Sequence, residues 1–188
     1  LQADHEKYGI SREFIDGVRN GTLALIEGAH RTGKSTLCRY LAYYLLHNET
    51  GRAAYYSSDY NAIALVERMA NQHFNVTAEV LSDRFRIYRT GAARSTRTAS
   101  EALEALKRHL SGMIPEYRLI ILDSPGRFLA AVTPREQMSF ITSCRDLYQP
   151  SRSIVMVLDH HAVDEDTLAQ ARQTTGCYLV TMMRKETA

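Results

Sequence analysis

Cysteine, net charge and long apolar runs are all scarce in this sequence of 188 residues. Its three cysteines, Cys38, Cys144 and Cys177, lie far apart and form no C-x-x-C pair. This spacing predicts reduced, mostly buried thiols rather than a disulfide or a zinc site. The formal net charge of +2 is too small to indicate nucleic-acid binding by itself.

No apolar run approaches the ~18–20 residues that span a bilayer. The first residues also lack the charged and then apolar pattern of a secretory leader. We therefore expect a cytoplasmic protein that does not insert into a membrane. The chain starts without Met and stops soon after a strand-like segment, so we expect a piece of a longer protein, shortened at its C-terminus.

Short apolar segments alternate with helix-like stretches along the chain. We expect strands over 22–28, 52–59, 84–89, 117–123, 153–159 and 177–183. We expect helices over 35–48, 62–74, 98–113, 134–149 and 164–176, and a mobile loop over 90–100. Strands that are apolar on both faces and alternate with helices predict an α/β fold, a three-layer sandwich with a mostly parallel sheet. The length suits a single domain over residues 1–188.

The stretch GAHRTGKST, residues 28–36, satisfies the phosphate-loop pattern G-x-x-x-x-G-K-[ST] between a predicted strand and a predicted helix. Its glycines let successive backbone N–H groups point inward at phosphate oxygens, and the helix N-terminus adds to the attraction. The lysine would reach the β- and γ-phosphates and the serine hydroxyl would bind Mg²⁺. We predict that ATP is bound by Gly28, Ala29, His30, Arg31, Thr32, Gly33, Lys34, Ser35 and Thr36.

A second feature supports this prediction. The segment LIILDS places four apolar residues before Asp123, the form of a buried strand that ends in a magnesium-organising carboxylate. We therefore expect Asp123 to share a Mg²⁺ ion with Ser35. A buried strand can also end in Asp for structural reasons alone.

The last third of the chain has a pattern that is more specific to one family than the phosphate loop is. It carries His160, His161, Asp164, Glu165, Leu168, Arg172 and Cys177 in the stretch VMVLDHHAVDEDTLAQARQTTGCYLVTMM. Together with the opening GVRNGTLALIEGAHRTGKSTLCRYLAYYLL, this stretch resembles the archaellum motor ATP-binding proteins of the FlaH (ArlH) family. These proteins are single-domain relatives of the clock protein KaiC in the RecA superfamily.

The resemblance implies a RecA-like domain that binds ATP and assembles into a ring, most simply a hexamer. It implies a place at the membrane-proximal base of a motility motor, beside a secretion-type motor ATPase and a membrane platform protein. In that setting the protein acts as a regulatory subunit with weak or no ATP hydrolysis, held at the cytoplasmic face of the membrane through its partners.

The resemblance also assigns a role to Asp59. In RecA-like ATPases a residue that is usually Glu ends the strand after the phosphate-loop helix and orients the attacking water. Asp59 stands at that position and is one methylene shorter. In-line attack depends on accurate placement of the water, so a shorter carboxylate predicts slow hydrolysis. A structural alternative is that Asp59 caps the helix that starts near Ala62.

Asp159, His160 and His161 resemble a metal cluster. Successive strand residues point to opposite faces, so the two histidines do not share one ion, and Asp159 with His161 lacks an evident third ligand. We expect instead that His160 or Asp159 lies near the γ-phosphate and reports its presence. The alternative is a polar strand end with no such role.

A basic stretch in the middle of the chain contains Arg84, Arg86, Arg89, Arg94 and Arg97. Few aromatic residues accompany it, so a solvated, subunit-contacting or acidic-partner surface is favoured over DNA binding. Arg184 and Lys185 follow the last expected strand, where the resemblance to ring-forming proteins implies cations that reach a neighbouring subunit's nucleotide. The alternative is a charged terminus with no such role. Two other functions stay open. One is a KaiC-like ATPase that phosphorylates itself on Thr174 or Thr175, and the other is a RecA/RadA-type DNA-stimulated ATPase.

Overall fold

The computed structural model describes residues 10–90, 98–113, 115–148, 150 and 152–182. Six parallel strands form one sheet in the order β3-β2-β4-β5-β1-β6. The strands are β1 (Leu23–Gly28), β2 (Arg52–Ser57), β3 (Phe85–Arg89), β4 (Tyr117–Asp123), β5 (Ser153–Asp159) and β6 (Cys177–Thr181). The predicted α/β fold with a parallel sheet is therefore confirmed.

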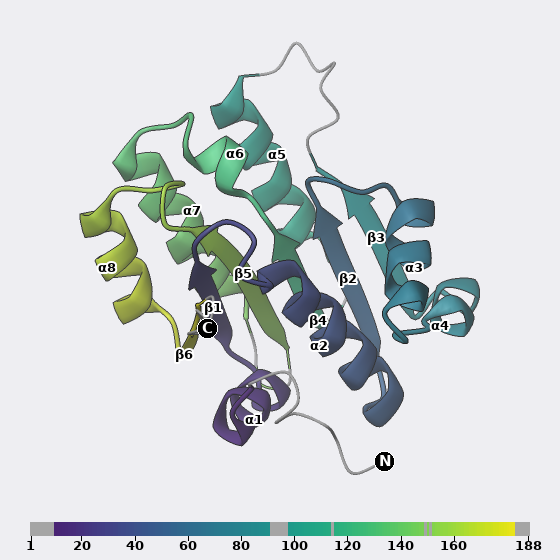
Figure 1. Cartoon of the computed structure of the whole chain (residues 1–188). Coiled ribbons are helices and arrows are strands. Elements are labelled where there is room, and N and C mark those ends of the chain that lie inside the picture. Colours follow the sequence, from purple (N-terminus) through teal and green to yellow (C-terminus); the bar gives the residue numbers. More distant parts are fainter. Residues whose placement is uncertain (1–9, 91–97, 114, 149, 151, 183–188) are drawn as a thin grey trace, which may run out of the picture.

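Helices cover both faces of this sheet (Figure 1). They are α1 (Arg12–Asn20), α2 (Lys34–Asn48), α3 (Ala62–Asn71), α4 (Thr77–Leu81), α5 (Ala99–Ser111), α6 (Gly126–Leu129), α7 (Pro134–Leu147) and α8 (Glu165–Thr174). All six predicted strands and all five predicted helices are present, with ends that differ by at most three residues. Three further helices were not predicted from the sequence, namely α1, α4 and α6, which have only 9, 5 and 4 residues.

Alternating strand residues build two cores. In β1, Ala24 and Ile26 join the core that contains residues of α1, α2 and α3, whereas Leu23 and Leu25 join the core on the side of α5, α7 and α8. Successive strand side chains point to opposite faces, so a strand that is buried along its whole length, such as β1, carries apolar residues on both faces, with Glu27 as a charged residue that is ion-paired. This explains the continuous apolar runs of the sequence.

Local signals fix several helix starts. Thr98 and Thr133 each form a capping box with the glutamate three residues later, at the starts of α5 and α7. The three cysteines are free, with Cys38 and Cys144 buried, as predicted. In the described part of the chain, no helix has the length and hydropathy that crossing a membrane requires.

Candidate functional site

The site lies where the parallel strands end. The register pairs Gly28, the last residue of β1, with Asp159 of β5 on one side and with Thr181 of β6 on the other. Asp123 ends β4, the next strand beyond β5. Ligands of open parallel sheets bind at this carboxyl edge, so the fold brings the predicted phosphate loop and the predicted magnesium carboxylate together.

The loop between β1 and α2 arches over this edge (Figure 1). Gly33 has a φ of 91° and serves as the N-cap of α2 without a side-chain hydrogen bond. A helix start of this kind leaves its first backbone N–H groups available to an anion. Gly28 has a φ of 157°, and a Cβ there would overlap the Oγ1 atom of Thr181. Glycine is therefore required at the first position of the loop by its close approach to β6.

Lys34 is buried at the start of α2, with 7% of its side chain exposed. Its Nζ atom donates to the carbonyl oxygens of Gly28 at 3.0 Å and Ala29 at 2.5 Å. It also lies 2.7 Å from Oδ1 of Asp159. The side chain of Lys34 thus folds back along its own loop. Its charge lies at the end of β1, where the lysine of a phosphate loop reaches the β- and γ-phosphates.

Ser35 and Asp123 meet as the sequence analysis expected. The hydroxyl of Ser35 donates to Oδ1 of Asp123 at 2.9 Å, and the hydroxyl of Tyr55 in β2 donates to Oδ2 at 2.5 Å. Burial raises the pKa of Asp123 above its usual value, and the hydrogen bonds from Tyr55 and Ser35 offset part of that rise. A hydroxyl and a carboxylate oxygen are ligands that Mg²⁺ prefers, so the donor set fits this ion.

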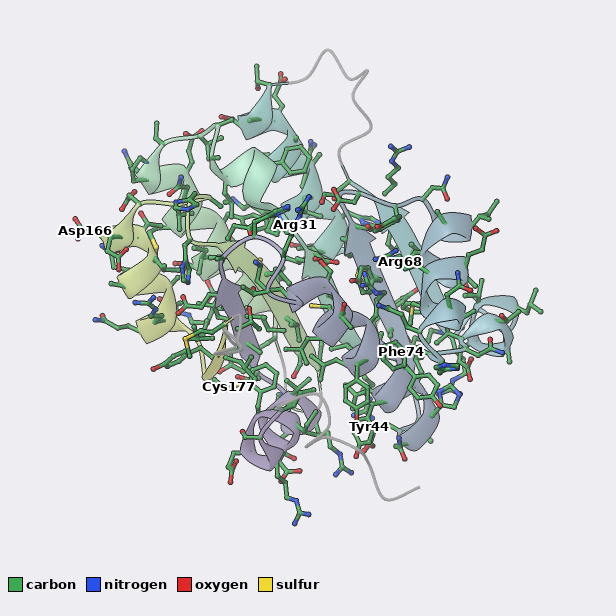
Figure 2. The ribbon with its side chains drawn as sticks, viewed as in Figure 1. Arg31, Tyr44, Arg68, Phe74, Asp166 and Cys177 are labelled. Carbon is green, nitrogen blue, oxygen red and sulfur yellow. The ribbon has the colours of Figure 1, made fainter. Side chains whose placement is uncertain are left out.

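A cavity of about 650 Å³ connects these groups. This volume lies within the ~300–1,000 Å³ range of small-molecule sites. Figure 2 shows Arg31 in the phosphate loop, and Arg68 on α3 also lines the cavity. The lining includes every residue from His30 to Thr36, together with Ser58, Asp59, Arg68, Asp123, Ser124, Gly126, Ala130, Val157, Asp159, His161 and Ala162.

Asp59 lines this cavity from two residues beyond the end of β2, where its side chain is exposed. The helix-capping alternative for Asp59 is wrong, because Asn61 is the N-cap of α3 and accepts the hydrogen bond from the backbone N–H of Ala64. Oδ1 of Asp59 accepts a hydrogen bond from the hydroxyl of Ser58 at 3.2 Å, and Asp59 does not cap the helix.

Two residues at the end of β5, His160 and Asp159, were the alternatives expected near the γ-phosphate, and only one of them lines the cavity. His160 is exposed and is not among the residues that line the cavity, whereas Asp159 and His161 are. The register places Asp159 beside Gly28, and this pairing decides which side chain faces the loop. Among the described residues, no group of three His, Cys, Asp or Glu side chains is arranged to hold a metal ion, so the metal alternative has no support here.

Two contacts around the loop were missed in the sequence. Thr181 shares a hydrogen bond of 2.6 Å with Thr32, which ties β6 to the phosphate loop. Arg172 of α8 contacts Glu27, the residue before Gly28, with a shortest distance of 2.9 Å. Glu27 is a charged residue inside an apolar strand, and this pattern indicates that Glu27 needs an oppositely charged partner.

Two arginines of the basic stretch have structural contacts. Arg84 donates to backbone carbonyls of Leu46, Glu49 and Gly51 near the end of α2, and Arg86 pairs with Asp83 at 2.6 Å. These contacts favour a structural role for the two arginines over DNA binding. Four other basic residues of that analysis lie outside the described residues, as do most residues of the predicted mobile loop: Arg94, Arg97, Arg184 and Lys185.

The threonines of the autophosphorylation alternative lie away from the cavity. Thr174 ends α8, and the backbone N–H of Gly176 donates to Leu23 at the start of β1. The phosphate loop follows the other end of β1, roughly 17 Å away at ~3.3 Å per strand residue. Transfer within one chain therefore has no support in this arrangement.

The chain is similar in sequence and in fold to an archaeal flagellar protein. Over 78 residues the chain is 32% identical to the archaeal flagellar ATP-binding protein FlaH of Methanocaldococcus jannaschii. The crystal structure of flagellar accessory protein FlaH from that organism matches 98% of this chain and 80% of its own, with a TM-score of 0.77 and 22% identity. The predicted resemblance to FlaH is confirmed.

A KaiC-like protein from Pyrococcus horikoshii has the same fold as well, with a TM-score of 0.62, 14% identity, and coverage of 89% of this chain and 74% of its own. The aligned part of the sequence match to FlaH spans 39% of this chain and 33% of that relative. No family model matches the chain. The fold is therefore FlaH-like and KaiC-like over nearly all of its length.

Proposed function

We propose that the protein binds ATP at the phosphate loop and Mg²⁺ at Ser35 and Asp123, as a single RecA-like domain. One observation carries this proposal: Lys34, the uncapped start of α2 and the Ser35–Asp123 pair all face one cavity. The backbone N–H groups and Lys34 would hold the β- and γ-phosphates. Bound Mg²⁺ would neutralise part of the phosphate charge.

We further propose a regulatory role in an archaellum-type motility motor. The support is the similarity to FlaH, which is named an archaeal flagellar ATP-binding protein and a flagellar accessory protein. In this role the protein forms a ring of identical subunits. It works beside a secretion-type motor ATPase and a membrane platform protein, and it reaches the membrane surface only through them.

Slow hydrolysis is part of the proposal. Asp59 is the carboxylate that the cavity offers for orienting a water on the side of β2, and it is one methylene shorter than glutamate. General-base catalysis needs hydrogen-bond reach to the attacking water. The protein then holds ATP and changes the state of its partners, while most of the bound nucleotide stays intact.

Equilibrium binding of a fluorescent Mg-ATP analogue tests the site. We expect Lys34→Ala to abolish binding, because it removes the cation at the phosphates. Lys107→Ala is a matched control, since Lys107 pairs with Glu104 on α5 and does not line the cavity. Equal affinity of Lys34→Ala and wild type would refute the phosphate-loop assignment. DNA-stimulated turnover, or labelled phosphate retained on denatured protein, would favour one of the two other functions.

A further inference from the structure

The hydrogen-bonding capacity of Lys34 is fully used. An ammonium group has three N–H donors and no acceptor. Three oxygens lie within reach of its Nζ atom, namely the carbonyl oxygens of Gly28 and Ala29 and Oδ1 of Asp159. A phosphate oxygen that binds Lys34 therefore has to replace at least one of these contacts.

The three contacts differ in kind. Gly28 and Ala29 belong to the loop that curls around the phosphates, and their carbonyls are neutral. Asp159 belongs to another strand, is an anion, and lines the same cavity. The backbone of Asp159 is held in place, because the sheet register sets it beside Gly28 and its carbonyl accepts a hydrogen bond from the N–H of Ala162 in the following turn.

A phosphate that approaches Lys34 meets the carboxylate of Asp159 at close range. Like charges at such distances repel, and water screens only part of this repulsion, since the side chain of Asp159 is 36% exposed and that of Lys34 is 7% exposed. The contact between Lys34 and Asp159 is thus the one that nucleotide binding breaks. Breaking it has a free-energy cost that the nucleotide must overcome.

We propose that Asp159 is an internal competitor for Lys34, which lowers the affinity for nucleotide and selects for ligands whose β-phosphate displaces it. This inference rests on the proposed function and names a specificity-determining residue within that site. Because Lys34 reaches the β- and γ-phosphates, the competition affects ATP and ADP and spares AMP. The carboxylate of Asp159 is released when either of the two longer nucleotides binds.

The test compares Asp159→Asn with wild type. Asparagine keeps the size of the side chain and removes its charge. Asp166→Asn is the matched control, since Asp166 is exposed in the first turn of α8 and projects away from the phosphate loop (Figure 2). Affinities for Mg-ATP, Mg-ADP and AMP are measured by isothermal titration calorimetry, and circular dichroism verifies that each variant is folded.

We expect Asp159→Asn to tighten Mg-ATP and Mg-ADP binding about tenfold, which corresponds to about 1.4 kcal/mol. AMP affinity stays within about twofold, and Asp166→Asn resembles wild type for all three ligands. Unchanged binding in Asp159→Asn would overturn the inference. Weaker binding would also overturn it and would mark Asp159 as a residue that orients a ligand of Mg²⁺.

Two further outcomes separate this inference from the proposed function. An equal gain in Asp166→Asn would show that net charge alone matters, which overturns the competition and leaves ATP binding intact. Absence of Mg-ATP binding in wild type and in Asp159→Asn would overturn both. Binding that is detectable only in Asp159→Asn would support the competition strongly.

Discussion

The ion pair between Glu27 and Arg172 gives the sharpest prediction on stability. Glu27 has only 1% of its side chain exposed, and Arg172 has 33%. The Nε atom of Arg172 lies 3.1 Å from both carboxylate oxygens, and Nη2 lies 2.9 Å from Oε1. Arg172→Met keeps an unbranched side chain of good helix propensity and leaves the carboxylate of Glu27 buried without its cation.

Removing one partner of a buried pair costs ~3–5 kcal/mol. Because a third of Arg172 is exposed, water can reach part of the freed carboxylate. We therefore expect a smaller loss of about 2–3 kcal/mol in the free energy of unfolding. Urea denaturation followed by circular dichroism measures this loss as a lower midpoint with an unchanged slope.

Arg145→Met is the matched control. Arg145 pairs with Asp146 on the surface of α7, where the side chains are 47% and 64% exposed, so its replacement should cost less than ~1 kcal/mol. The double variant Glu27→Leu with Arg172→Met removes both charges and should recover most of the stability. Equal midpoints for Arg172→Met and Arg145→Met, or a double variant no better than Arg172→Met, would refute the reasoning.

Three further predictions follow from other contacts. Arg84→Ala should lower the free energy of unfolding by about 2 kcal/mol, because three backbone carbonyls lose a charged donor. Arg86→Ala is the control and should change the free energy of unfolding little. Equal losses for the two variants in urea denaturation would contradict this prediction. Burial raises the pKa of Asp123, so the folded state takes up its proton more readily. Stability from this group should fall as pH rises from about 4 through that raised pKa, and Asp123→Asn should flatten the dependence measured by urea unfolding. Asp59→Glu should increase phosphate release if the carboxylate orients water, and an unchanged rate would argue against that role.

The phosphate loop could be predicted because its chemistry is local. Gly28, Gly33, Lys34 and Ser35 are close in sequence, and the pattern includes the strand before it and the helix after it. Asp123 could be predicted because an apolar strand that ends in a carboxylate is visible in the sequence. Both were then placed together by parallel strands whose carboxyl ends share one edge.

Residues that depend on strand register could not be predicted in the same way. Whether Asp159 or His160 faces the loop depends on the pairing of β5 with β1, which no local pattern encodes. Tyr55 is an ordinary apolar strand residue by sequence, and its hydroxyl contacts Asp123 only because β2 and β4 are neighbours. The short helices α1, α4 and α6 offer too few turns for a clear apolar period.

Incubation of the purified protein with γ-labelled Mg-ATP tests the central claim most directly, when bound ATP, free phosphate and protein-attached phosphate are resolved together. The account predicts that wild type retains intact ATP with little free phosphate and none attached to protein, and that Lys34→Ala retains no ATP. Rapid release of phosphate by wild type would contradict the regulatory role. Failure of wild type to retain any ATP would contradict the site itself.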